Sequence, residues 1–308
     1  MPLRIAVVPA STKAGRETIR QLLAAESKPL VRAIYRDPSK APADFTQNPN
    51  FEAVKGDVGA GAGLDFSSAD AVFYIPPPTY DGTNQGEWAT RCATNVKKAI
   101  QDAPTIKRVL LFSALGAQHD HSIGVLHLNH ISETTLRDAA QEVIMVRPGF
   151  FYDEFAHALE EARAGDPPAF HSWITPVDHK IPMVSLKDIA KFCANALLVG
   201  SGKPSTSSPH LFKLFGPRHY SALDVKEAVE QAMGGKPVEL KSVERDQLAG
   251  FFGQQIPQAH VQEFVDMVTA VLPDGVIEGD FEYDENTVRG GVELGDALRE
   301  LAAKGTGK

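Results

Sequence analysis

The chain has 308 residues, of which 31 are lysine or arginine and 39 are aspartate or glutamate, so its formal net charge is −8. An acidic chain without a basic run longer than a pair is poorly suited to a phosphate backbone, so we expect no nucleic-acid partner. Its two cysteines, Cys92 and Cys193, are too few and too far apart for a disulfide framework or a thiolate zinc site, and they favour a cytoplasmic location. No apolar run approaches the roughly 18 residues of a membrane span, so we expect no membrane partner.

Short apolar runs alternate with helical patterns through the first half of the chain. The runs lie at residues 4–8, 31–35, 51–54, 71–75, 108–112 and 143–146. Residues 18, 19, 22 and 23 share one face of a helix, and further helices are expected at 88–100 and 131–140. Repeated strand–helix units with nearly continuous apolar strands predict a parallel sheet covered on both faces. The expected fold class is therefore α/β, a doubly wound parallel (Rossmann) sheet.

The pattern changes after residue 155. The sequence Gly-Asp-Pro-Pro at 165–168 predicts a loop, and residues 173–177 are too irregular to assign. Beyond them we expect a helix at 185–198, a surface connection at 200–208, strands at 211–215 and 238–240, and helices at 222–233 and after 245. We expect residues 1–155 to form the Rossmann domain, with 185–200 packing back onto it. Residues 156–184 and 201–308 would form a smaller α/β lobe that binds the substrate.

The first strand-to-helix turn is where such a sheet usually binds the pyrophosphate of a dinucleotide. Here it reads Pro9-Ala10-Ser11-Thr12-Lys13-Ala14-Gly15. Together with the segments described next, it resembles the GATGxxG turn of the NmrA-like family of atypical short-chain dehydrogenases/reductases. Aligning Gly15 with the last glycine places Pro9 and Thr12 where the other two glycines stand. Thr12 would then hold the phosphates farther off or contact them through its hydroxyl, helped by Lys13. The same turn also fits a plain helix start capped by Ser11 or Thr12.

Six further segments resemble the family in the same order along the chain. They are Tyr35–Pro38 (YRDP), Gly56–Val58 (GDV), Ile75–Pro78 (IPPP), Leu111–Gly116 (LFSALG), Val146–Phe155 (VRPGFFYDEF) and Lys180–Ile189 (KIPMVSLKDI). The resemblance covers most of residues 3–245 and implies a cofactor site formed by Pro9, Ser11, Thr12, Lys13, Gly15, Arg36, Asp57, Val58, Pro76, Pro77, Ser113, His130, Pro148 and Gly149. Arg36 stands where an NAD enzyme carries an acidic residue, and arginine suits a 2′-phosphate, so NADP(H) is the expected cofactor. A solvated surface arginine fits the same position.

The catalytic residues of the usual short-chain dehydrogenases are only partly present. Those enzymes use a serine and a YxxxK helix, in which the tyrosine donates a proton. Ser113 occupies the serine position, whereas Leu126 and His130 stand in place of the tyrosine and the lysine. An imidazole at His130 would bind a ribose or substrate oxygen or shuttle a proton, or it lies on a helix flank without such a role. The family segments also make Tyr152, Asp153 and Lys180 candidates for an acid or an anchor, and surface polar residues explain them equally well.

A local concentration of histidines suggests a metal site at first sight. His119, His121, His127 and His130 lie close together in the sequence, with Asp120 between the first two. No HExxH spacing is present, and a polar loop followed by a helix explains the group, so we expect no metal.

Three functions remain open. The first is an NADPH-dependent reductase that lacks the YxxxK dyad and acts on a small, largely apolar metabolite in specialised metabolism. The second is an NADP(H)-sensing regulator without turnover, which would bind a protein partner. The third is a cyclase or isomerase that reuses the Rossmann cleft, with aromatic residues such as Phe150, Phe155 and Trp173 lining a pocket.

Overall fold

The computed structural model describes residues 2–304, and this part of the chain divides into two compact units. The first unit contains the residues up to 118, together with 126–147 and 189–212. The second contains 119–125, 148–188 and the described residues from 213 onward. Compared with the expected division, residues 119–125, 148–155 and 185–188 lie in the second unit and 201–212 in the first. Local bonds account for this, because the Gly149 N–H donates to Leu214 O (3.0 Å) and the Ser208 hydroxyl accepts from Val143 N (2.9 Å).

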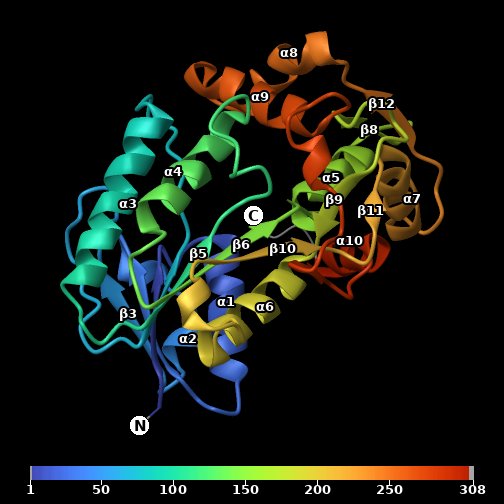
Figure 1. The fold of residues 1–308 in the computed structure, drawn as a ribbon. Helices are drawn as coiled ribbons and strands as arrows, with labels where there is room; N and C mark the ends of the chain where they lie inside the picture. Colours follow the sequence, from blue (N-terminus) through green and yellow to red (C-terminus); the bar gives the residue numbers. More distant parts are fainter. Residues whose placement is uncertain (1, 305–308) are drawn as a thin grey trace. The chain divides into compact units, whose positions relative to one another are not determined.

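The first unit is built from strand–helix repeats, shown in blue to green in Figure 1, and from α6, shown in yellow. In chain order these are β1 (Arg4–Val8), α1 (Lys13–Ala24), β2 (Leu30–Tyr35), α2 (Ala43–Thr46), β3 (Phe51–Lys55), β4 (Ala71–Tyr74), α3 (Gln85–Gln101), β5 (Arg108–Phe112), α4 (His127–Leu136), β6 (Glu142–Pro148) and α6 (Leu186–Val199). The sheet runs in the order β13-β10-β6-β5-β4-β1-β2-β3, and the pairings among β1–β6 are parallel. This confirms the doubly wound α/β class.

Two expected helix ranges differ from those observed. Helix α3 is longer than expected because Asn84 accepts a hydrogen bond from Glu87 N and so caps a start at Gln85. Helix α4 covers His127–Leu136 instead of 131–140. The residues after Leu136 leave the helix in a turn in which Ala139 N donates to Leu136 O (3.0 Å).

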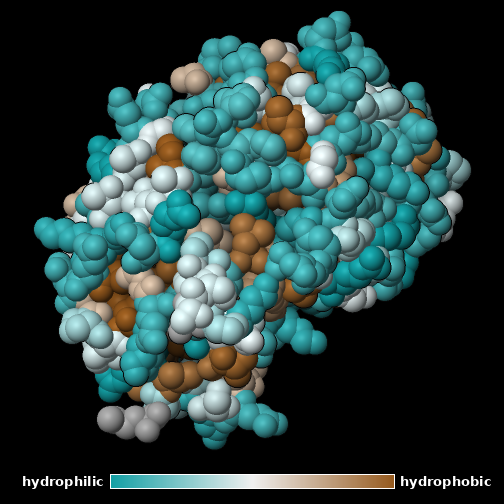
Figure 2. All heavy atoms as spheres, in the orientation of Figure 1, coloured by the Kyte–Doolittle hydropathy of each residue, from teal (hydrophilic) through white to brown (hydrophobic). Residues whose placement is uncertain are grey.

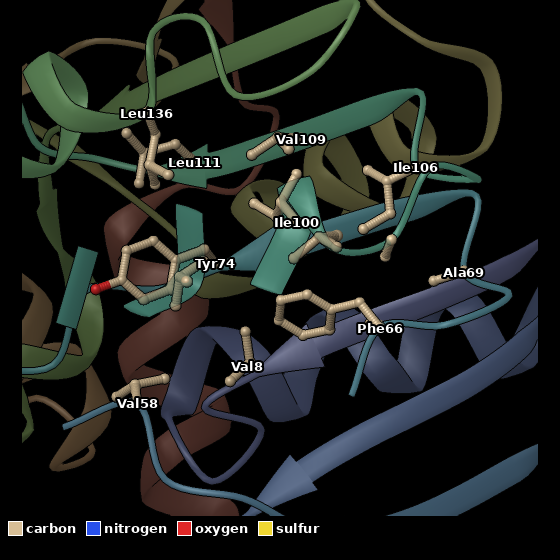
Figure 3. Packing of buried hydrophobic residues seen from close by; sticks show 14 of the residues in the cluster. Val8, Val58, Phe66, Ala69, Tyr74, Ile100, Ile106, Val109, Leu111 and Leu136 are labelled. Carbon is tan, nitrogen blue, oxygen red and sulfur yellow. The ribbon is translucent and has the colours of Figure 1, made fainter. Parts of the chain in front are cut away.

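A hydrophobic core lies between the sheet and helices α3 and α4. Figure 3 shows Val8 of β1, Tyr74 of β4 and Val109 and Leu111 of β5, three neighbouring strands, packed with Ile100 of α3. Alternate residues of these strands are buried on the opposite side as well, as the fully buried strand patterns show. Both faces of the sheet are thus covered, which leaves the strand ends as the exposed edges of this unit.

The second unit contains shorter elements. They are β7 (Phe150–Phe151), α5 (Ala156–Ala164), β8 (Ala169–Ser172), β9 (Ile181–Val184), β11 (His219–Tyr220), α7 (Ala222–Ala232), β12 (Glu239–Ser242), α8 (Leu248–Phe252), α9 (Val261–Val271), β13 (Thr287–Arg289) and α10 (Leu294–Lys304), while β10 (His210–Phe215) begins in the first unit and ends in the second. Two small sheets, β11-β9-β7 and β12-β8, belong to this unit. The sequence pattern had not revealed β8 or β9, because strands of four residues carry too little periodicity.

The surface is mostly polar in the view of Figure 2, where hydrophobic residues form separate spots rather than one broad patch. Within residues 2–304, the large hydrophobic side chains that are exposed are Tyr80, Val199, Leu223 and Val276. No helix in this range is long and apolar enough to cross a membrane.

Candidate functional site

The turn after β1 is closed by Thr12. Its hydroxyl accepts a hydrogen bond from Gly15 N (2.9 Å) and donates to Pro9 O (3.3 Å), so Thr12 is the N-cap of α1. The hydroxyl is therefore occupied within the turn. A phosphate at this turn would meet the other N–H groups of the first helical turn and the exposed side chains of Ser11 and Lys13.

Gly15 is required by the close packing of this turn. A Cβ at Gly15 would lie 2.8 Å from Thr12 Oγ1, 3.1 Å from Pro9 O and 3.2 Å from Ala10 O. These distances are shorter than ordinary van der Waals contacts, so the last glycine of the motif keeps its role of bringing helix and strand together.

Four cations gather near the ends of β2 and β3. Arg36 directly follows β2, and Lys55 is paired with Tyr35 in the register of the two strands. Lys40 and Lys55 act on Asp37, and Arg16 of α1 acts on the Tyr35 hydroxyl. All four side chains are exposed, and none forms a salt bridge with another residue of the described range. Only Arg36 had been identified from the sequence, because the strand register that adds Lys55 is not visible there.

The acidic residue beside Arg36 does not neutralise it. Asp37 Oδ1 accepts hydrogen bonds from Ser39 N (3.0 Å) and from Ser39 Oγ (2.7 Å). These bonds to Ser39, assisted by the charges of Lys40 and Lys55, lower the pKa of Asp37 below its usual value. Because the carboxylate is held by its own loop, Arg36 remains available to an anionic ligand.

Helix α3 fixes the loops that follow β3 and β4. The Asn95 amide donates to Val58 O (2.9 Å), and Trp88 Nε1 donates to Pro77 O (2.8 Å). Asp57 Oδ1 accepts from Gly59 N (2.8 Å), which closes a tight turn after Gly56. Val58 is itself part of the core, as Figure 3 shows, so this loop would contact a ligand mainly through its backbone.

The proline segment after β4 extends the same edge of the sheet. Ile75 N still bonds to Val8 O (3.0 Å), whereas Pro76 and Pro77 lie beyond the strand. Pro76 is buried and Pro77 is half-buried. A rigid segment that cannot donate to a neighbouring strand suits the border of a binding site.

A buried polar network surrounds Ser113 at the end of β5. The Ser113 hydroxyl donates to Glu133 Oε1 (2.5 Å), and Arg147 binds both oxygens of Glu133, at 2.8 Å through Nε and 2.6 Å through Nη2. Arg147 Nη1 also donates to Gln118 Oε1 (2.7 Å). The side chains of Glu133 and Arg147 are only 10% and 11% exposed, and Ser113 is 2% exposed. Sequence reasoning had missed Glu133 and Arg147.

His130 is anchored to the loop that follows Ser113. Its Nδ1 lies 3.0 Å from Ala117 O, and its ring stacks on that of His127 with centroids 5.6 Å apart. The structure therefore brings Ser113 and His130 to one loop, residues 113–118. Leu126, in the tyrosine position, offers no polar group.

The remaining candidates lie in the second unit, where their surroundings differ. Tyr152 is fully buried, and its hydroxyl donates to Val292 O (3.1 Å). Burial raises the pKa of Tyr152, so this phenol is a core group and is poorly placed to donate a proton to a ligand. Asp153 is half-buried and Lys180 is exposed.

The last cofactor candidates are Pro148, which ends β6, and Gly149, which follows it, and both lie in the second unit. A Cβ at Gly149 would lie 2.5 Å from Pro182 O, so a side chain does not fit there.

The histidines near residue 120 divide into separate contacts. His119 Nε2 lies 2.8 Å from Asp280 Oδ2, and His121 Nδ1 lies 2.5 Å from Asp120 Oδ1. Across residues 2–304, no group of three or more histidine, cysteine, aspartate or glutamate residues is arranged to hold a metal ion.

The fold and this edge of the sheet define the class of dinucleotide-binding Rossmann proteins. Within that class, residues 1–286 match the model of the NmrA-like family, and the chain belongs to this family. The expected resemblance is thereby confirmed. No curated protein sequence gives a significant match.

Several solved structures share the fold. Triphenylmethane reductase from Citrobacter sp., complexed with NADP(H), is 17% identical and has a TM-score of 0.72, with 97% of this chain and 100% of that chain covered. An NADPH-dependent quinone oxidoreductase from Escherichia coli, complexed with NADPH, is 18% identical with a TM-score of 0.74, covering 96% and 99% of the two chains. NmrA, a negative transcriptional regulator, is 17% identical with a TM-score of 0.66, covering 99% and 97%. Reductases and a regulator thus share this architecture, so the fold alone does not decide between them.

Proposed function

We propose that this protein binds NADP(H) and is an oxidoreductase acting on a small, largely apolar metabolite in specialised metabolism. The observation that carries the proposal is the group of exposed cations Arg16, Arg36, Lys40 and Lys55, none of them in a salt bridge within the described range. Concentrated positive charge beside a dinucleotide turn suits the 2′-phosphate that distinguishes NADP(H) from NAD(H).

The residues of the first unit fit such a cofactor. Ser11, Lys13 and the start of α1 would hold the pyrophosphate, with Gly15 allowing the close turn and Pro9 and Thr12 shaping it. The loops at Asp57–Val58 and Pro76–Pro77 would border the adenine half. Ser113, His130, Pro148 and Gly149 would border the nicotinamide half, as the family resemblance implies. When bound, the cofactor supplies hydride chemistry, and the protein supplies binding, orientation and exclusion of water.

A fluorescence titration with NADPH and NADH tests the cofactor. Arg36→Ala should weaken NADPH binding about 10- to 100-fold, since a charge-assisted contact contributes about 1.5–3 kcal/mol, and should change NADH binding little. Lys107→Ala, which removes an exposed lysine just before β5, is the matched control and should change neither. Equal losses for NADPH and NADH in Arg36→Ala would refute the 2′-phosphate assignment.

A regulator that senses NADP(H) without turnover, through a protein partner, is the second candidate. It is favoured by Leu126 at the tyrosine position and by Ser113, whose hydrogen is already bonded to Glu133. NADPH that binds tightly, with no hydride exchange either from NADPH to a carbonyl, imine or enone substrate or from an alcohol to NADP⁺, would support this candidate over the oxidoreductase.

A non-redox cyclase or isomerase is the remaining alternative. In the second unit Phe150 and Phe155 both pack on Trp173, with ring centroids 5.1 and 6.3 Å away. Phe155 and Trp173 are only 4% and 8% exposed, so the half-buried Phe150 is the ring of this cluster that would meet an apolar substrate. Failure of NADPH and NADH to bind would favour the non-redox enzyme.

A further inference from the structure

Two groups at the carboxyl edge of the first unit have already used their hydrogen atoms. Ser113 Oγ lies 2.5 Å from Glu133 Oε1, and both oxygens of that carboxylate face Arg147. A carboxylate only accepts hydrogen bonds, so the hydroxyl hydrogen of Ser113 points to Glu133. Toward any other group, Ser113 presents lone pairs.

The same argument fixes the hydrogen of His130. Its Nδ1 lies 3.0 Å from Ala117 O, and a carbonyl oxygen only accepts, so Nδ1 carries the hydrogen. In the neutral ring Nε2 then holds a lone pair. Nε2 has no partner among the described residues and is not one of their fully buried unpartnered atoms, so part of it is exposed on this half-buried histidine.

The loop holds Ala117 O in place. Ala117 N donates to Ala114 O (3.1 Å), and Gly116 adopts a left-handed φ of 93° that favours glycine. Gln118, the next residue, is held by Arg147 Nη1 at 2.7 Å. The carbonyl is therefore not free to turn away and release the other tautomer of His130.

We propose that this edge of the site is lined by hydrogen-bond acceptors, with His130 Nε2 the principal one, and that the ligand group bound there is a donor. The ligand class is thus an alcohol, phenol or N–H compound, whose hydroxyl or N–H hydrogen bonds to Nε2. A bare carbonyl or ether has no hydrogen to offer this edge. The corresponding edge of the usual short-chain dehydrogenases carries donors, so the polarity is reversed here. The ligand class deepens the proposed function and rests on it, whereas the tautomer of His130 does not.

Nitrogen NMR of the full-length protein with ¹⁵N-labelled histidine tests the tautomer first. At a pH where the ring is neutral, we expect the His130 signal of a ring protonated on Nδ1. A signal of the Nε2-protonated ring would overturn the proposal. This measurement needs no cofactor, substrate or activity.

Matched probes then test the ligand class. Cyclohexanol and phenol, which donate a hydrogen bond, should shift the Nε2 resonance of His130 toward the value of a hydrogen-bonded nitrogen and bind several-fold more tightly than cyclohexanone and anisole. Equal binding of the four probes, or no Nε2 shift with cyclohexanol and phenol at their highest soluble concentrations, would contradict the proposal.

The variant His130→Asn distinguishes the roles of Nδ1 and Nε2 of His130. In His130→Asn the side-chain amide occupies the place of Nδ1 and can still donate to Ala117 O, whereas Nε2 is lost. We expect the variant to unfold like the parent and to lose the preference for alcohols. His121→Asn, which changes an exposed histidine, should keep that preference. If His130→Asn keeps the preference as well, Nε2 is not the acceptor.

The proposal about His130 and the proposed NADP(H) binding can fail independently of each other. If Arg36→Ala leaves NADPH binding unchanged while His130 shows the expected tautomer and probe preference, the cofactor assignment fails. The proposal that His130 Nε2 accepts a hydrogen bond from the ligand is then still supported. If NADPH binds as expected and His130 is protonated on Nε2, only the proposal about His130 fails.

Discussion

Removing the carboxylate of Glu133 should destabilise the first unit strongly. Glu133→Ala leaves the Arg147 guanidinium, whose side chain is only 11% exposed, without a counter-charge. It also leaves the Ser113 hydroxyl, in a residue 2% exposed, without its acceptor. Loss of one partner of a buried ion pair costs about 3–5 kcal/mol. We expect the free energy of unfolding to fall by an amount in this range.

Urea unfolding followed by circular dichroism measures this loss, and two variants calibrate it. Glu133→Gln keeps a carbonyl oxygen for Ser113 or Arg147, so it should lose less than Glu133→Ala. Asp138→Ala breaks the pair with Lys97 (2.7 Å), in which Asp138 is 71% exposed, and it should cost no more than about 1 kcal/mol.

A double-mutant cycle with Arg147→Met separates the pair from its surroundings. If the two side chains act as a unit, the double variant should be more stable than the sum of the single losses predicts. A loss in Glu133→Ala as small as that in Asp138→Ala would show that the network is well solvated, and would remove the basis for fixing the Ser113 hydrogen.

Four further predictions follow from single contacts. Gly15→Ala should cost about 1–3 kcal/mol of unfolding free energy and weaken NADPH binding, because its Cβ displaces the capping hydroxyl of Thr12; unchanged stability would contradict the close packing. Burial opposes ionisation of Glu142, but hydrogen bonds from Ser201 and the charge of Arg108 outweigh burial and lower the pKa of Glu142. The ionised carboxylate should therefore stabilise the fold above about 4.3, the pKa in the unfolded chain, and this stabilisation should be lost as the pH falls from there through the lower folded pKa. Acid titrations of unfolding should be flatter in Glu142→Gln. Tyr152→Phe should leave turnover unchanged and lower the free energy of unfolding by about 1–3 kcal/mol, because Val292 O loses its hydrogen-bond donor. Loss of turnover without loss of stability would instead support Tyr152 as the catalytic acid. Raising the ionic strength from about 0.05 to about 0.5 M should weaken NADPH binding more than NADH binding, because screening acts mainly on the 2′-phosphate contact.

The sequence carried enough information for the sheet and for the turn that follows its first strand. Continuous apolar runs such as Arg4–Val8 and Arg108–Phe112 became central strands, because a strand buried on both faces needs an unbroken run. Gly15 was recognisable because it aligns with the last glycine of the family's turn, and the structure shows that a side chain does not fit there. Arg36 was recognisable because it directly follows a strand. These features are local in sequence, and local pattern is what sequence reasoning reads well.

Features that depend on tertiary pairing were not predictable. Lys55 joins the cationic group only through the register Tyr35↔Lys55, and Glu133 meets Arg147 only because α4 packs beside the end of β6. The charges of Glu133 and Arg147 suggested exposure, yet they are buried because each neutralises the other. Tyr152 stood next to aspartate and glutamate in the sequence, yet it is fully buried because a carbonyl of residue 292 satisfies its hydroxyl.

The two departures from the family's pattern act on opposite ends of the proposed cofactor site. Thr12 uses its hydroxyl to cap α1, so it adds no new donor for the pyrophosphate. His130 is shorter than lysine and bonded to Ala117 O, so it brings no extended ammonium to the nicotinamide half. Positive charge in the proposed site is therefore concentrated around Arg36, where the 2′-phosphate would lie. In such an arrangement the charges would bind the dinucleotide through its adenine half. Hydrogen bonds would then determine which ligand binds beside the nicotinamide half. For this reason we expect cofactor selectivity and ligand selectivity to respond to different substitutions, the first to Arg36→Ala and the second to His130→Asn.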